Sequence, residues 1–494
     1  MKSFSKWSAV WAGAAAALAA ALYAGTLSHP PVWDDHAFVF GQPFLRDCAN
    51  VGRVLAPGAW LRPLPVAGSA RPAWLLTVLL DTCAGGGARV AYRVSNLFWH
   101  AAGAATVAAL AWELTASAPA CAAAGLLFAA HPAHVEAVNI VTFRSDQMCL
   151  VFMILALLAY REWLRSEGAL SAATGSAALV FAAAALLSKE MAVTLPLLAL
   201  LSDALAPAGD GRRRRLTRWA TAAAAALVCL YLAFRAPRSG YVMRSTEDFF
   251  SAVRDGGLAA RATPRPAAFE DPPWAAVYGD ARARALTMSA VLGRELRRLA
   301  WPSDLQGDYA PEVVVSPLRL DVLGAWALWL LVVVAAWKLR RRPAASFGLA
   351  WAAVCFLPVC GLVALYNLEA DRYLYVPTAG ACLAAAAAFD AAWRSRSAWA
   401  RPAAAAVLAG LVAAGAALVL RRNRVYSSDA ALLESVLAAD PKVPRAHLGL
   451  AILAEDHGRL AEARAHLSAA ASLAPGYARA SDALARFDAR HPRR

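Results

Sequence analysis

Long apolar runs alternate with short polar segments along most of the chain. Eleven runs predict membrane-spanning helices, although several are shorter than the roughly 20 residues that a full crossing needs. We therefore expect an all-α, polytopic membrane domain of about eleven transmembrane helices over residues 1–424. The predicted spans are Trp7–Leu27, Val94–Trp112, Ala118–Ala130, Gln147–Tyr160, Ala169–Leu187, Met191–Leu205, Trp219–Phe234, Leu320–Trp337, Ala344–Tyr366, Tyr373–Phe389 and Pro402–Leu420.

Three further helices are predicted between the spans. Trp74–Leu80 is too short to cross and suits the membrane interface, and Asp280–Ala300 lies in the long loop 237–317. Pro132 favours the first turn of a helix, so Pro132–Phe143 predicts an interfacial or re-entrant helix. The first run follows Lys2 and Lys6 like a signal peptide, but no small-residue cleavage site follows it, so we expect an uncleaved span.

Residues 425–494 predict a separate helical domain. Pro441 and Pro475 are 34 residues apart, which is the period of the tetratricopeptide repeat (TPR). The alanine and leucine spacing between them fits one helix–turn–helix unit. Leu432–Ala439 suits the last helix of a preceding unit, and Tyr477–Phe487 suits a capping helix. A short TPR-like domain is therefore expected at the C-terminal end, where it could bind a protein partner.

Composition agrees with a membrane protein. Of the 494 residues, 60% are hydrophobic and 17% are charged, whereas a soluble protein would carry about 25% charged residues. The net charge is +15, but the densest basic runs, 212–215 and 338–342, lie between spans, so we expect no nucleic-acid binding. Six of the eight cysteines fall in apolar runs and no CxxC occurs, which predicts neither a disulfide scaffold nor a zinc site.

The short basic loops predict the orientation. With Lys2 and Lys6 in the cytoplasm, four of these loops also fall there, as the positive-inside rule requires; Arg421–Arg424 runs against it. This threading places the C-terminal domain on the opposite face. We therefore expect an integral protein of a bacterial inner membrane with this domain in the periplasm or its lumenal equivalent.

Five islands of ionisable residues fall on that same non-cytoplasmic face. A charge at the end of an apolar run is costly unless it faces a polar cavity, so their convergence predicts an active site. Carboxylates there can act as a general base, and the cations suit phosphate. The islands are Asp34-Asp35, Arg71, the stretch 131–146, Lys189-Glu190 and Asp371-Arg372.

Metal binding is left open at this point. His131, His134 and Glu136 do not form an H-E-x-x-H motif and do not share one helical face, which argues against a zinc metalloprotease. The acid pair Asp34-Asp35 could hold a divalent metal ion instead of supplying a base.

The motifs together resemble one enzyme family. HPAHVEAV followed by R-S-D, LSKEMAVTLP and DRYLYVP occur in the order and spacing of the transmembrane and TPR O-mannosyltransferases (TMTC-like), within the GT-C glycosyltransferases. The resemblance implies a GT-C fold and a polyprenyl-phosphate sugar donor with a mannose-like sugar. It also implies a Ser/Thr hydroxyl acceptor on an exported protein and inversion at the anomeric carbon.

The resemblance also implies residue roles. Asp34 or Asp35 would be the catalytic base, and the residues that hold the donor phosphate would be Arg71, His131, Arg144, Lys189 and Arg372. Supporting residues would be His134, Glu136, Asp146, Glu190, Asp371 and Tyr375. The chain departs from the family at Phe143, where glycine is usual before the R-x-D arginine, and at Asp371, where glutamate is usual.

Other functions remain open from the sequence. The same catalytic layout would serve sugar transfer to a lipid-linked or envelope glycan. From a different class, the chain could be a non-catalytic scaffold that recruits exported partners through its repeats, and a transporter is a weaker third. Loss of transfer after substitution of both first-loop aspartates would separate an enzyme from a scaffold.

Overall fold

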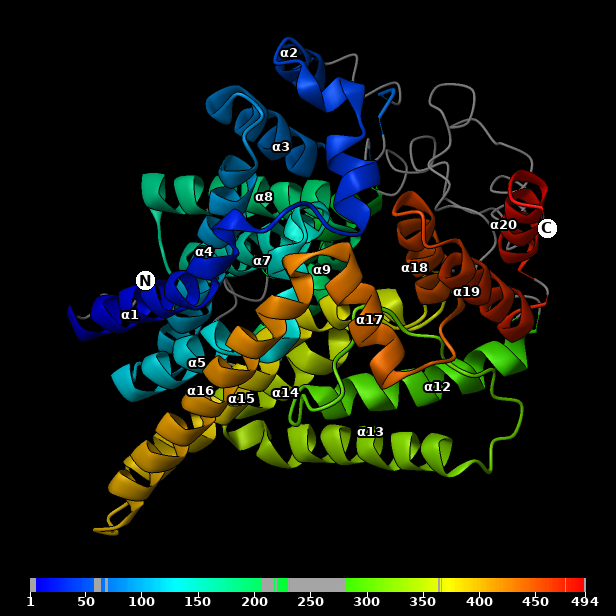
Figure 1. Ribbon diagram of the computed structural model, residues 1–494. Helices are drawn as coiled ribbons and strands as arrows, with labels where there is room; N and C mark the ends of the chain where they lie inside the picture. Colours follow the sequence, from blue (N-terminus) through cyan, green and yellow to red (C-terminus); the bar gives the residue numbers. More distant parts are fainter. Residues whose placement is uncertain are drawn as a thin grey trace.

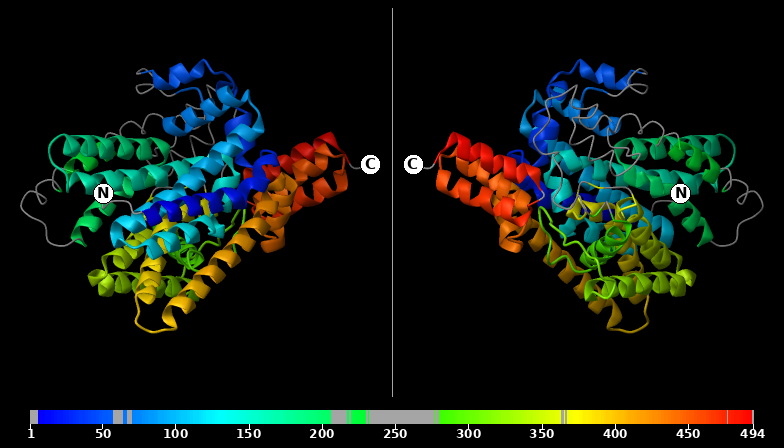
Figure 2. Two further views of the ribbon diagram at one scale, coloured as in Figure 1. Left: turned by 90° about the vertical axis from the view of Figure 1, so that its left-hand side faces the viewer. Right: turned by 90° about the vertical axis from the view of Figure 1, so that its right-hand side faces the viewer.

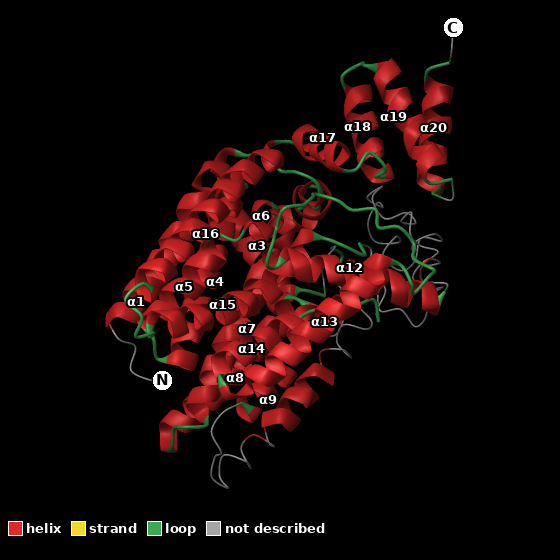
Figure 3. Cartoon of the chain, turned by 90° about the horizontal axis from the view of Figure 1, so that it is seen from below, coloured by secondary structure: helices red, strands yellow, loops and turns green. Residues whose placement is uncertain are grey.

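The computed structural model describes residues 6–56, 64–66, 70–205, 217, 220–229, 231, 277, 280–362, 365, 367–475 and 477–492. Over these ranges the chain forms helices joined by loops and turns, without a strand (Figure 3). Most helices form one large bundle, and a smaller group at the C-terminal end projects from it (Figures 1 and 2). The all-α expectation is confirmed for this part of the chain.

Seven helices of the described residues are long and apolar enough to cross a membrane. Each coincides with a predicted span, so the expectation of a polytopic membrane protein is confirmed. With their adjoining 3-10 turns these spans are built on α1 (Lys6–Tyr23), α4 (Arg89–Thr115), α7 (Arg144–Trp163), α8 (Gly168–Ser188), α13 (Leu320–Lys338), α15 (Tyr375–Trp393) and α16 (Ala400–Asn423).

The other four predicted spans are shorter or bent. Helix α5 (Ala118–Ala129) and the segment Pro132–Asn139, which includes α6 (Val135–Asn139), are bent by 47° at a break and pass the length test only together. Helices α9 (Leu195–Ala204) and α14 (Pro343–Val354) are short, and Ala220–Cys229 is the described helical part of the span predicted at 219–234. The number of eleven spans stays a prediction, and residues 212–215 and 237–276 lie outside the described residues.

Helix α7 lies at the centre of the bundle, and α16 lies at its edge. In the apolar window of the α7 span 83% of the residues are buried, against 6% in that of α16, which suits a lipid-facing helix. Helices α14 and α15 cross at Gly348 and Gly380, where an added Cβ would meet the facing backbone at 2.6 and 2.5 Å. Small residues let the two backbones approach closely, as in other membrane bundles.

Three helices outside the spans shape the face where the islands lie. The predicted interfacial helix is α3 (Pro72–Gly85), and the predicted loop helix is α12 (Ala281–Arg298), whose first turn is capped by Asp280. Both helices are confirmed, and the interfacial position of α3 stays a prediction. Helix α2 (Asn50–Leu55) lies near α3, and a Cys48–Cys83 disulfide joins the loop before α2 to α3. The sequence did not predict this disulfide, which the two cysteines outside the apolar runs form with each other.

The C-terminal domain consists of α17 (Asp429–Ala439), α18 (Pro444–Asp456), α19 (Leu460–Leu473) and α20 (Ala478–Arg490). Consecutive helices pack against each other as antiparallel pairs (Figures 1 and 3). Gly458 turns the chain between α18 and α19 with a φ of +72°, a conformation that glycine adopts without strain. The predicted helix–turn–helix unit and capping helix are confirmed.

Candidate active site

The structure joins four of the five islands through ion pairs, and hydrogen bonds to Asp35 join the fifth. Arg71 precedes α3 and pairs with Glu190 after α8, with Nη2 and Oε1 2.7 Å apart. Lys189, also after α8, pairs with Asp146 in the first turn of α7 at 2.5 Å. Each of these contacts links two islands that are far apart in the sequence. The packing therefore brings these charged residues together, and their role as an active site stays a prediction.

Arg372 and Glu136 form a third, buried pair between two islands. Arg372 Nη1 lies 2.5 Å from Glu136 Oε1, and the Arg372 backbone N–H donates to Glu136 Oε2 at 2.7 Å. Burial in an apolar setting strengthens this pairing and makes loss of either partner costly. The guanidinium also lies over the Phe143 ring, 4.2 Å from its centroid. The residue that replaces the usual glycine therefore supports a predicted phosphate ligand through a cation–π contact.

The two first-loop aspartates have different surroundings. Asp35 is fully buried and accepts three hydrogen bonds, from the backbone N–H groups of Val141 and Thr142 and from the Thr142 hydroxyl, at 2.9–3.1 Å. Asp34 is half-buried and makes no hydrogen bond or ion pair with any described residue. Asp35 thus ties the first loop to the turn before α7, whereas the carboxylate of Asp34 is available for a substrate.

Burial raises the pKa of Asp34 to about 6. The positive charges of Arg372 and Arg445 oppose this rise, and the negative charges of Glu136 and Asp35 add to it. Arg372 has the largest effect among these charges, so the predicted base and one predicted phosphate ligand lie within electrostatic range of each other. A carboxylate with a pKa near the working pH is suited to general-base catalysis.

The cations form a connected group with one exception. Lys189 pairs with Asp146, Arg71 pairs with Glu190 beside Lys189, and Arg372 pairs with Glu136. Arg144 is fully buried elsewhere. It donates to Asn96 Oδ1 at 2.7 Å and to the Tyr92 carbonyl at 2.9 Å, and it pairs with Asp81 at 2.6 Å. Its guanidinium, at the start of α7, is therefore held by partners on α3 and α4.

The aromatic and histidine candidates lie beside this group. His131 Nε2 is 3.2 Å from the Leu299 carbonyl. His134 and Tyr375 are fully buried with their ring centroids 4.6 Å apart, and the Tyr375 hydroxyl is 2.9 Å from His100 Nδ1. These contacts belong to the interior that supports the site. Within the described ranges, no three His, Cys, Asp or Glu residues come together as a metal-binding group.

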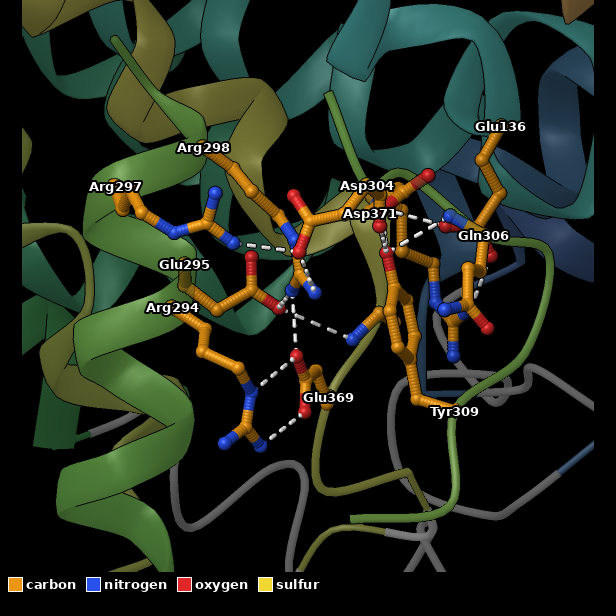
Figure 4. Close-up of polar contacts among 12 residues, drawn as sticks. Glu136, Arg294, Glu295, Arg297, Arg298, Asp304, Gln306, Tyr309, Glu369 and Asp371 are labelled. Atoms are coloured by element: carbon orange, nitrogen blue, oxygen red, sulfur yellow. Dashed lines mark hydrogen bonds and ion pairs between the residues drawn. The ribbon is translucent and has the colours of Figure 1, made fainter. Parts of the chain in front are cut away.

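A second ionic network, around Glu369, borders the site (Figure 4). Most of its residues were not predicted from the sequence. Glu369 lies between two arginines of α12, Arg294 at 2.6 Å and Arg298 at 2.5 Å. Arg298 also pairs with Asp304 at 3.0 Å. The four-residue spacing of the two arginines on one helix face is the signal that could have indicated a shared partner.

Asp371 belongs to this network through Tyr309 and Arg422. It accepts a hydrogen bond from the Tyr309 hydroxyl at 2.5 Å and pairs with Arg422 at 2.9 Å. Arg422 is one of the arginines that run against the positive-inside threading. Its pairing with Asp371 and its bond to the Leu305 carbonyl at 2.5 Å give this charge a local structural use.

Comparison with known proteins gives relatives of the expected kind. The chain is 35% identical over 198 residues to the protein O-mannosyl-transferase Tmtc1 of Drosophila melanogaster, covering 39% of this chain and 22% of that protein. Tmtc2 of the same organism is 33% identical over 195 residues, covering 38% and 21%. TMTC2 of Mus musculus is 30% identical over 155 residues, covering 31% and 18%.

The matched region thus spans about a fifth of the length of these relatives. A family model described as a tetratricopeptide repeat matches residues 430–487, which contain α18, α19 and most of α17 and α20. No solved structure matches the chain, so the GT-C topology stays an expectation. The chain is a helical integral membrane protein that is similar in sequence, over less than half of its length, to protein O-mannosyl-transferases named Tmtc1 and Tmtc2, and a tetratricopeptide repeat lies near its C-terminal end.

Proposed function

We propose that the protein is a membrane glycosyltransferase that moves a mannose-like sugar from a polyprenyl-phosphate donor to Ser or Thr hydroxyls of exported proteins. The observation that carries this proposal is the carboxylate of Asp34, which has no hydrogen bond or ion pair within the described part of the chain and which the charge of Arg372 affects. A base and a cation in this relation suit attack by a hydroxyl and departure of a phosphate. The names of the relatives support the same chemistry.

In the proposed reaction Asp34 accepts the proton of the acceptor hydroxyl while the oxygen of that hydroxyl bonds to the anomeric carbon of the sugar. The bond between that carbon and the phosphate oxygen breaks, and the phosphate leaves with the bonding electrons, so the configuration inverts. We assign the phosphate to Arg372, Lys189 and Arg71, together with His131. Each of the three cations ion-pairs with a carboxylate of another island. Arg144 is assigned to supporting the fold, because all its contacts are internal.

We place this site on the non-cytoplasmic face, in the periplasm or its equivalent. The basic-loop threading favours that side. The Cys48–Cys83 disulfide adds a second argument, because it lies in and beside the first loop, which also carries Asp34. Disulfides persist in oxidising compartments and are rare in the cytosol. A lipid-linked donor would reach the site from the membrane, and the TPR domain would bind the acceptor protein.

The raised pKa of Asp34 predicts a pH dependence of transfer. Below a pH of about 6 the carboxyl is mostly protonated and cannot accept a proton, so the rate should fall as the pH drops through that value. Measuring kcat/KM against pH for the wild type tests this. Burial also raises the pKa of Asp35. If Asp34 is the base, the fall in rate near pH 6 should remain in the pH profile of Asp35→Asn. A profile that stays flat between pH 5 and 8 would exclude a base with the pKa of Asp34.

The acceptor class is tested by mass spectrometry of exported proteins in cells that lack the gene. The proposal predicts hexose on Ser or Thr residues that is absent from these cells and returns when the gene is restored. Loss of a hexose from lipid-linked or envelope glycans instead, with protein hexose unchanged, would support the glycan-acceptor alternative. If neither pool changes, the scaffold alternative is favoured.

A further inference from the structure

The first helix of the TPR domain contacts the loop that carries the proposed base. Asp429, the first residue of α17, accepts a hydrogen bond from the Trp33 backbone N–H through Oδ1 at 2.8 Å. Its Oδ2 lies 2.7 Å from Nε2 of His36. One carboxylate therefore holds the chain on both sides of Asp34-Asp35, from a domain almost 400 residues away.

Trp33 has a backbone conformation that needs support. Its φ is +55°, in the left-handed region that residues other than glycine rarely adopt. Such conformations persist where the surroundings hold them, and they gather at functional sites. The Trp33 side chain packs against the cluster formed by Leu433 and Val436 of α17 and by residues of α18. Because Asp34 follows directly, a rotation at Trp33 would move its carboxylate.

Two other contacts join the same repeat helices to the loop around Asp308. Arg445 of α18 ion-pairs with Asp308 and donates to Asn367 Oδ1 at 2.8 Å. At Gly307 the side chain of Leu432 leaves no room for a Cβ atom. Arg445 is also one of the cations whose charge acts on Asp34. Helices α17 and α18 therefore border the proposed site.

We propose that Asp429 is a positioning residue for Asp34: by holding the Trp33 N–H and the His36 ring, it fixes the orientation of the proposed base. The first TPR helix would then be a working part of the active site in addition to any role in acceptor binding. This inference rests on the proposed function of Asp34, but the contact itself can be measured without any transfer activity.

The test compares Asp429→Ala and Asp429→Asn with a matched control, Glu434→Ala. Glu434 is an exposed acidic residue of the same helix, and it has no hydrogen bond or ion pair with the described part of the chain. Hydrogen exchange of the purified full chain in nanodiscs reports the Trp33 amide. Protection should be lost in Asp429→Ala, largely retained in Asp429→Asn, whose side-chain oxygen still accepts the bond, and unchanged in Glu434→Ala.

The second measurement is the rate of sugar transfer, with polyprenyl-phosphate mannose as donor and envelope proteins from cells lacking the gene as acceptors. Asp429→Ala should lower kcat by on the order of 10²-fold, the scale of a small misplacement of a catalytic group. The donor KM should change little, and Asp429→Asn should restore most of the rate. A kcat of Asp429→Ala equal to that of Glu434→Ala would overturn the positioning role, as would equal exchange at Trp33. If the wild type transfers no sugar, the proposed function fails, and the exchange data still decide whether Asp429 holds the loop.

Discussion

Replacement of Asp34 by asparagine is expected to lower sugar transfer by on the order of 10²–10⁴-fold, the contribution of a positioned general base. The substitution keeps the size of the side chain and removes its ability to accept a proton. Asp34 has no hydrogen bond or ion pair to lose within the described residues, so the fold should be unaffected. The measurement is kcat with polyprenyl-phosphate mannose, together with the melting temperature in the same detergent.

The neighbouring Asp35→Asn variant serves as the contrast. Asp35 accepts bonds from two backbone N–H groups and one hydroxyl, and an amide would turn an N–H donor toward some of these donors. Leaving a buried donor unpaired costs about 1–3 kcal/mol, so this variant should melt at a lower temperature. If Asp34→Asn retained full activity while Asp35→Asn abolished it at unchanged stability, the assignment of the base would have to be exchanged.

Replacement of Lys189 by methionine is expected to destabilise the protein by about 3–5 kcal/mol, the usual cost of removing one partner from a buried pair. Lys189 is 5% exposed and Asp146 is 1% exposed, with 2.5 Å between the charged groups. Removal of the lysine leaves the Asp146 carboxylate without its direct partner. The shift in melting temperature of the purified protein measures this effect.

The double variant Lys189→Met with Asp146→Leu separates stability from function. Replacing a buried ion pair by apolar side chains is often neutral for stability, so the double variant should recover most of the loss. Transfer should stay low if Lys189 also binds the donor phosphate. A double variant that regains both stability and transfer would limit Lys189 to a structural role.

The gathering of charged residues in the candidate site could be predicted from the sequence, because charge placement in a membrane protein is strongly constrained. A charge at the end of an apolar helix must find a polar partner or a cavity. That rule predicted that Arg71, Lys189 and Arg372 would converge, and their ion pairs with carboxylates of other islands confirm it. Local patterns likewise predicted α3, α12 and the TPR helices, since hydrophobic spacing and proline positions act within one element.

The partners of individual charges could not be predicted, because they depend on how the helices pack. Arg144 and Arg372 look alike as ends of apolar runs, yet Arg144 is enclosed among α3 and α4 and Arg372 lies near Asp34. The Glu369 network depends on the approach of α12 to a distant loop. Asp34 and Asp35 have different surroundings because the turn before α7 donates hydrogen bonds to Asp35. This contact between distant segments cannot be predicted from two adjacent aspartates in the sequence.

The central claim is that the protein transfers a sugar from a lipid phosphate to protein hydroxyls, with Asp34 as the general base. The most direct test incubates the purified chain in nanodiscs with polyprenyl-phosphate mannose and envelope proteins from cells lacking the gene. Hexose on Ser or Thr and released polyprenyl phosphate are then measured together. We predict that both appear in equal amounts with the wild type and that neither appears with Asp34→Asn. Equal hexose transfer by the wild type and by Asp34→Asn, or none by the folded wild type, would contradict the account.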